Sequence, residues 1–185
     1  MRKVLSPVFL KKYFYTSLYL SFVVTMYGCP YSSPYKIDSE PSVLIEESFI
    51  GKWATITSNS AGNRAPVKMI VSKRNEYEYD LSFTGNINDL KYYNIVKDDT
   101  LKATAFISDV DSRRFLNIYI KGQSYIAEFI QKNEKVTLLP LCEHFTVKMI
   151  KSNAELKQAL ELHYKTRLYP LYDDEFCLRE MSRVN

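Results

Sequence analysis

The sequence has few of the residues that common catalytic and phosphate-binding motifs require. It contains five glycines and no glycine-rich phosphate loop. Its two histidines, His144 and His163, lie outside any His-Glu-x-x-His motif. Cys142 and Glu143 precede His144 directly, but neighbouring residues of a strand point to opposite faces, so this run does not predict a nucleophile and its base. We therefore expect a protein that is not an enzyme and that holds no cofactor.

The sequence also lacks the spacing of a metal site. The acidic run at 173–175 does not alternate as the ligands of an EF-hand loop do, so we interpret it as a solvated turn. The 34 residues between Cys142 and Cys177 do not resemble a zinc-ligand spacing. No metal is expected.

The N-terminal region also lacks an apolar run that is long enough for a lasting transmembrane helix. The apolar stretch at 13–27 has 15 residues, whereas a helix that crosses the hydrocarbon core needs ~20. The residues before it include no acidic side chain and four basic ones, which are Arg2, Lys3, Lys11 and Lys12. A basic start, a short apolar run and a small residue at its end are typical of a secretory signal peptide, which we place at residues 1–28.

The end of this stretch, Met26-Tyr27-Gly28-Cys29, resembles the lipobox of bacterial lipoproteins. The resemblance implies that the Cys29 thiol receives a diacylglyceryl group, that the chain is cut before Cys29, and that the new amino group is acylated. Each buried CH₂ stabilises attachment by ~0.8 kcal/mol, and more than one chain is needed to hold a protein on its membrane. The expected location is the bacterial cell envelope. Pro30 is not the Asp that often retains lipoproteins at the inner membrane, so the outer membrane is favoured and its side stays open. An uncleaved anchor and plain export are the alternatives.

Removal of residues 1–28 leaves a chain without net charge. Four of the 25 basic residues and none of the 21 acidic ones lie before Cys29. A nucleic-acid-binding domain is expected to present a basic surface, which this balance argues against. The expected partner is a membrane, reached through acyl chains on Cys29, and not a nucleic acid.

The remaining chain divides into a tether at 29–48 and one domain at 49–185. Pro30, Pro34 and Pro41 disfavour helix and central strand, so residues 30–42 are expected to form an extended spacer between the lipid surface and the domain.

The domain is predicted to be mostly β. Residues 76–83 alternate polar with aromatic or aliphatic side chains, which predicts a strand with one wet and one buried face. Further strands are predicted by single-parity apolar sets: Leu101, Ala103, Ala105 and Ile107; Leu116, Ile118 and Ile120; Tyr125, Ala127 and Phe129. Short turns between them favour an antiparallel up-and-down meander of eight or nine strands between Gly51 and Ile150. We expect a closed barrel, with a strongly curved open sheet as the alternative. The predicted interior mixes Tyr77, Tyr79 and Phe83 with alanines, and such a barrel either is filled or holds one small ligand.

A C-terminal helix is predicted at 153–168. Ser152 and Glu155 form a capping-box pattern, and Leu156, Leu160 and Tyr164 share one face that can pack on the barrel. Pro170 ends this region, and 176–178 is expected to be an extended segment that adds to a sheet edge.

Gly51 and Trp53 open the first predicted barrel strand, and this Gly-x-Trp resembles the first motif of lipocalins and lipocalin-like proteins. The resemblance covers residues 49–150 as architecture. It implies that Trp53 closes the barrel floor, that the fold encloses an apolar ligand, and that a C-terminal arginine, either Arg167 or Arg179, stacks on Trp53.

Cys142 and Cys177 are the two cysteines left after lipidation of Cys29. Export permits their oxidation, and a disulfide would close a loop of about 36 residues and stabilise the domain by roughly 4 kcal/mol. Two free buried thiols are the alternative.

These observations favour a lipid-anchored, non-enzymatic barrel that binds a small apolar ligand. A structural or envelope-assembly protein with a filled barrel and an exposed apolar patch is the alternative. The sequence does not identify the ligand or a protein partner.

Overall fold

The computed structural model describes residues 30–58, 64–85, 100–167 and 170–184. The predicted signal peptide and Cys29 therefore lie outside the described residues.

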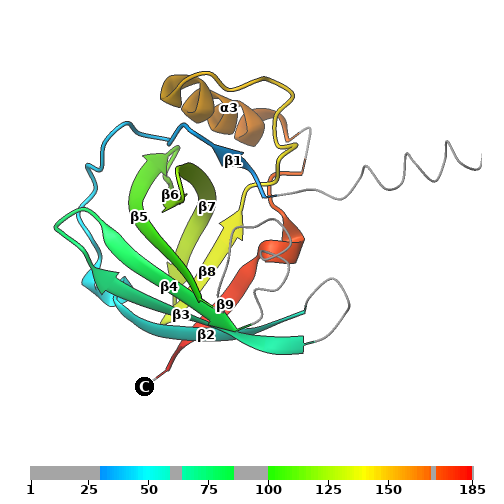
Figure 1. Cartoon of the computed structure of the whole chain (residues 1–185). Coiled ribbons are helices and arrows are strands. Elements are labelled where there is room, and N and C mark those ends of the chain that lie inside the picture. The colour runs from blue at the N-terminus through cyan, green and yellow to red at the C-terminus, as the bar shows by residue number, and fades with distance from the viewer. Residues whose placement is uncertain (1–29, 59–63, 86–99, 168–169, 185) are drawn as a thin grey trace, which may run out of the picture.

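Eight antiparallel strands form a closed barrel (Figure 1). In chain order these are β2 (Gly51–Ser58), β3 (Arg64–Lys73), β4 (Tyr79–Gly85), β5 (Thr100–Val110), β6 (Arg113–Ile120), β7 (Gln123–Lys132), β8 (Lys135–Pro140) and β9 (Leu178–Val184). Each strand pairs with the next, and β9 also pairs with β2, which closes the ring. The predicted mostly-β closed barrel is confirmed. Its eighth strand comes from the C-terminal tail, where only a short extended segment was expected.

The tight hairpins depend on residues with positive φ. The β5–β6 turn has Asp111 at φ 46° and Ser112 at φ 63°, and the β7–β8 turn has Asn133 at φ 50° and Glu134 at φ 58°. Two consecutive residues with positive φ give a turn whose twist matches that of the flanking strands.

The strand β4 begins three residues later than the alternation predicted. The Asn75 side-chain oxygen accepts hydrogen bonds from the backbone N–H groups of Tyr77 (2.8 Å) and Glu78 (2.9 Å), so this segment forms a turn instead. Tyr77 is 38 % exposed, and its predicted place in the barrel interior is therefore wrong.

The other predicted interior positions are confirmed. The inward side chains form one core cluster, and it includes all members of the three single-parity sets, with Tyr125 partly buried. A second cluster lies outside the barrel, beneath the helix α3 (Asn153–Thr166).

The helix α3 covers one side of the barrel (Figure 1). The Ser152 hydroxyl accepts from the Glu155 N–H at 3.2 Å, and the Glu155 carboxylate accepts from the Lys151 N–H at 2.8 Å. The helix ends at Arg167, which adopts φ 50°. Leu156 and Leu160 are fully buried in the second cluster, as their spacing predicted. None of the helices in the described residues is both long and apolar enough to cross a membrane.

Residues 30–46 lie against the barrel, which differs from the free spacer that the prolines predicted. The strand β1 (Ser32–Ser33) pairs with β7 beyond the point where β8 ends. The buried Ile37 donates its N–H to the Asn117 side-chain oxygen at 2.8 Å. A short 3₁₀ helix, η1 (Glu47–Phe49), then leads into β2. Proline prevents ladder pairing only at its own nitrogen, so the residues between the prolines are free to dock.

Candidate functional site

The barrel has two different ends, and the end where β2 begins is closed by a solid floor. Phe49 of η1 is fully buried, and its ring centroid lies 5.1 Å from that of Tyr79 and 4.7 Å from that of Phe129. Trp53 donates its indole N–H to the Phe49 carbonyl at 2.8 Å. Trp53 thus lies beside Phe49 at the barrel end where β2 begins.

The arginine over this tryptophan is Arg183, so the choice between Arg167 and Arg179 was wrong. The Arg183 guanidinium lies 4.9 Å from the Trp53 ring, and its Nη2 donates to the Ser48 carbonyl at 2.7 Å. Arg167 ends α3, and Arg179 pairs with Asp174 at 2.6 Å. The register between β9 and β2 places Arg183 opposite Trp53 and so decides which arginine lies over the tryptophan. The sequence contains no signal for the register between two strands that are so far apart along the chain.

Gly51 has a specific reason to be glycine. Its φ is +145°, and a Cβ atom there would lie 2.8 Å from Nη1 of Arg183. The glycine thus lets the arginine side chain approach the floor.

The opposite end, here called the mouth, is where β5 and β9 begin and where β8 ends. Five inward side chains near the mouth are 6–9 % exposed, and they are Phe83, Leu101, Ala103, Ile118 and Ile120; Val67, opposite Gly85 at the same end, is 2 % exposed. The inward side chains near the floor are 0–3 % exposed, including Trp53, Met69, Tyr79, Leu116, Phe129, Val136 and Met181. All of these side chains are buried, and those near the mouth are on average slightly more exposed than those near the floor.

The chemistry of the mouth is apolar. Ala103 faces Leu81 on one side by register, and Leu101 faces Phe83. Tyr125 is half-buried at the same end, and burial raises its pKa, so its phenol is neutral. These side chains offer mainly apolar contact.

The structure does not join Cys142 and Cys177. Both are buried free thiols: Cys142 donates to the Pro170 carbonyl at 3.0 Å and Cys177 to the Asp173 carbonyl at 3.3 Å. Burial is the main cause that raises the pKa of Cys142, and it raises the pKa of Cys177 to about 11. Neither thiol is therefore an activated nucleophile in this state. Their oxidation to a disulfide stays a prediction.

The other candidates considered from the sequence are dispersed. His144 is exposed, whereas His163 is buried on α3. Asp173 is buried and Asp174 pairs with Arg179, so the acidic run is only partly solvated. Among the residues that the structure describes, no three histidine, cysteine or acidic side chains are placed to hold a metal ion.

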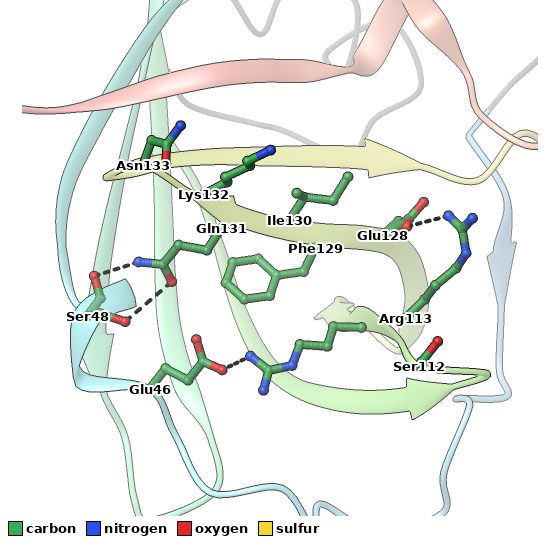
Figure 2. A pocket seen from close by; sticks show the side chains of 11 residues that line it. Glu46, Ser48, Ser112, Arg113, Glu128, Phe129, Ile130, Gln131, Lys132 and Asn133 are labelled. Atoms are coloured by element: carbon green, nitrogen blue, oxygen red, sulfur yellow. Dashed lines mark hydrogen bonds and ion pairs between the residues drawn. The ribbon is translucent and has the colours of Figure 1, made fainter.

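An open pocket of about 560 Å³ lies outside the barrel, between η1 and the strands β6 and β7 (Figure 2). Arg113 pairs with Glu128 at 2.9 Å, and Arg114 pairs with Glu46. Gln131 Nε2 donates to the Ser48 carbonyl at 3.2 Å. The two carboxylates in the pocket thus each face an arginine, an arrangement that ties η1 and the β5–β6 turn to the barrel.

Glu128 is a candidate functional residue that the sequence did not predict. It is 4 % exposed on the outer face of β7, where Tyr172 donates to its carboxylate and the Tyr164 hydroxyl lies 3.5 Å from Oε2. The Arg113 guanidinium also lies 4.2 Å from the Tyr164 ring. Burial, followed by the charge of Glu128, raises the pKa of Tyr164, which keeps it protonated as a donor. The alternation along β7 predicted an outward glutamate, but only the docking of α3 buries it.

The comparisons with known proteins add no relative. No protein-family model, curated protein or solved structure matches this chain. The function is therefore argued from the barrel and its surroundings alone.

Proposed function

We propose that this protein is a lipid-anchored, non-enzymatic binding protein of the bacterial cell envelope that holds a small apolar ligand at the mouth of its barrel. The observation that carries this proposal is the difference in burial between the two ends of the barrel interior. The floor is covered by Phe49, Trp53 and Arg183, whereas several apolar side chains near the mouth are slightly less buried. An apolar group that entered the mouth would remove this surface from water, which stabilises by ~25 cal/mol per Å².

The mixture of large and small inward residues supports a site in the half of the barrel nearest the mouth. Ala103, Ala105 and Ala127 are small residues among the inward side chains of the core. The ligand is expected to be slender, such as an acyl chain, because aromatic side chains already occupy the floor.

The proposed anchor gives such a site its location. Acylation of Cys29, within Met26-Tyr27-Gly28-Cys29, would keep the barrel at a membrane, where apolar molecules concentrate. Mass spectrometry of the mature N-terminus tests this part. We expect the chain to begin at Cys29 with lipid mass attached, and Cys29→Ala to lose the lipid. A parent protein that keeps residues 1–28, or an Ala variant that partitions into detergent as the parent does, would refute the anchor.

The ligand site is tested by filling the mouth. In Ala103→Phe, the larger ring is expected to occupy the proposed site and to weaken the binding of a dansyl-labelled fatty acid at least about tenfold, or ~1.4 kcal/mol. Ala54→Phe is the matched control, because Ala54 lies on the outer face of the neighbouring sheet region, opposite Lys68 and Ser182. Circular dichroism and urea unfolding show whether both variants are folded. If the parent, Ala103→Phe and Ala54→Phe bound the labelled fatty acid equally well, the proposed site would be refuted.

An interaction protein of the envelope is the second candidate, and one surface favours it. Ile56 is 61 % exposed and Ile70 is 47 % exposed on the outer faces of the adjacent strands β2 and β3. If Ile56→Asp abolished the cellular role while Ala103→Phe preserved it, the role would depend on this outer surface rather than on the mouth.

A further inference from the structure

We propose that the loop at 143–151 contacts the surface of the phospholipid bilayer beside the lipid anchor, so that the mouth end of the barrel is held next to the membrane. This inference rests on the proposed acylation of Cys29. It adds an orientation that acylation by itself does not specify.

The first argument is the place where the described chain begins. Pro30 forms a β-bridge with Cys142, and Tyr31 donates its N–H to the Leu141 carbonyl at 2.8 Å. The ring centroids of Tyr31 and Phe145 are 5.0 Å apart, with the rings nearly perpendicular. Cys29 is bonded directly to Pro30, and consecutive Cα atoms are ~3.8 Å apart. Because Pro30 and Tyr31 already lie against the barrel, they form no free spacer between an acylated Cys29 and this part of the barrel surface.

The second argument is the composition of the loop that follows Cys142. Val147 is 81 % exposed and Met149 is 79 % exposed, and no other large apolar side chain of the described residues is as exposed as these two. Phe145 before them is buried in the second cluster, and Ile150 after them packs against it. The loop is thus fixed at both ends while its two apolar side chains project into solvent. An exposed apolar pair held in this way is available for contact with an apolar surface.

The third argument is charge. Lys148 and Lys151 are exposed and flank Met149 and Ile150, and with the exposed Glu143 the loop carries two positive side chains and one negative side chain. Apolar side chains that enter the bilayer interface beside lysines that meet anionic headgroups are the combination expected of a membrane-contacting segment. The occupant assigned to this surface is accordingly a bilayer that contains anionic phospholipid.

The position of this surface bears on the mouth. Cys142 follows the end of β8, and β1 pairs with Ser124 and Tyr125 at the start of β7, both at the mouth end. In Figure 1 the blue strand β1 begins beside the segment that leads from β8 to α3, away from η1 at the floor. An anchor on Cys29, next to Pro30, therefore places the mouth, rather than the floor, toward the lipid. A ligand could then pass between the bilayer and the barrel over a short path.

The test measures which face of the anchored protein approaches lipid. The full chain is reconstituted into vesicles of phosphatidylcholine and phosphatidylglycerol that carry brominated acyl chains, which quench tryptophan on contact. Met149→Trp places the reporter on the loop. Leu44→Trp is the matched control, since Leu44 is 62 % exposed and precedes Ile45, which is hydrogen-bonded to Glu76 near the floor end. The emission of Trp53, which is 1 % exposed, is subtracted with the parent protein.

We expect loss of emission from Met149→Trp and none from Leu44→Trp, with both proteins floating with the vesicles. Quenching of neither reporter, or equal quenching of both, in protein that floats through its lipid would overturn the orientation while the anchor stood. A parent chain that fails to float would refute the anchor, and this inference with it. Val147→Trp gives a second reporter on the loop if Met149→Trp does not fold. Ligand binding is measured separately by Ala103→Phe, so its failure is distinguishable from either result.

Discussion

The contact between Arg183 and Trp53 should stabilise the barrel floor by an amount that a double-mutant cycle can measure. Arg183 is exposed at the end of β9, and a guanidinium over an indole at an exposed site is worth about 0.5–1 kcal/mol. The same side chain donates to the Ser48 carbonyl at 2.7 Å, and a hydrogen bond from a charged donor adds about 1.5 kcal/mol. Arg183→Ala is therefore expected to lower the free energy of unfolding by about 2 kcal/mol.

The second arm of the cycle is Trp53→Phe. It removes the donor to the buried Phe49 carbonyl, at about 1 kcal/mol, and leaves a small cavity in a fully buried site. Together these effects should cost about 3 kcal/mol. Because Arg183 then lies over a weaker aromatic partner, the double variant should lose less than the sum of the two single losses, by about 0.5 kcal/mol or more.

The assay is urea unfolding of the parent, the two single variants and the double variant, followed by circular dichroism. The slope of free energy against urea should stay constant, since the barrel remains the same size. Trp53 is the single tryptophan of the chain, so its emission in Arg183→Ala should also change before unfolding begins. Losses that add to within about 0.3 kcal/mol would refute the argument, because Arg183 would then stabilise the floor without Trp53.

Two further predictions concern the side of the barrel that α3 covers. Glu128→Gln should lower the free energy of unfolding by about 2 kcal/mol, because it weakens charge-assisted hydrogen bonds at a buried carboxylate whose partner Arg113 is partly exposed. Glu180→Gln, at an exposed pair, should cost less than about 1 kcal/mol, and equal losses in urea unfolding would contradict the role of burial. Burial lowers the pKa of His163 in the folded protein, so the unfolded chain binds the proton more tightly and acid favours unfolding. Stability should therefore fall as pH drops below about 6.5, and His163→Gln should remove part of this dependence in urea unfolding measured at several pH values.

Local patterns along the chain predicted the elements because each pattern reports on a short segment. The alternation of Leu101, Ala103, Ala105 and Ile107 describes which face of one strand is buried, and all four lie in the core. The pair Ser152 and Glu155 begins a helix through contacts within one turn. The exception on β4 has a local cause too, since Asn75 forms a turn that competes with the strand.

The proposed site could not be predicted from local patterns, because it depends on contacts between distant segments. The gradient from floor to mouth requires both the closure of the barrel by β9 and the burial of Phe49 beneath it, and neither is a periodicity of any single strand. The docking of 30–46 likewise depends on Asn117, which is 80 positions away from Ile37 in the sequence.

The sequence by itself determined the kind of most elements, the inward face of the strands, and the presence of a tryptophan where the first barrel strand begins. Only the tertiary structure decided which arginine covers that tryptophan, that the tail closes the barrel, and that Glu128 is buried by a helix and Tyr172. The physical reason is that alternation and capping act between residues that are neighbours along the chain. Register, closure and the docking of one layer on another are decided by the combined free energy of contacts between segments that the sequence keeps far apart.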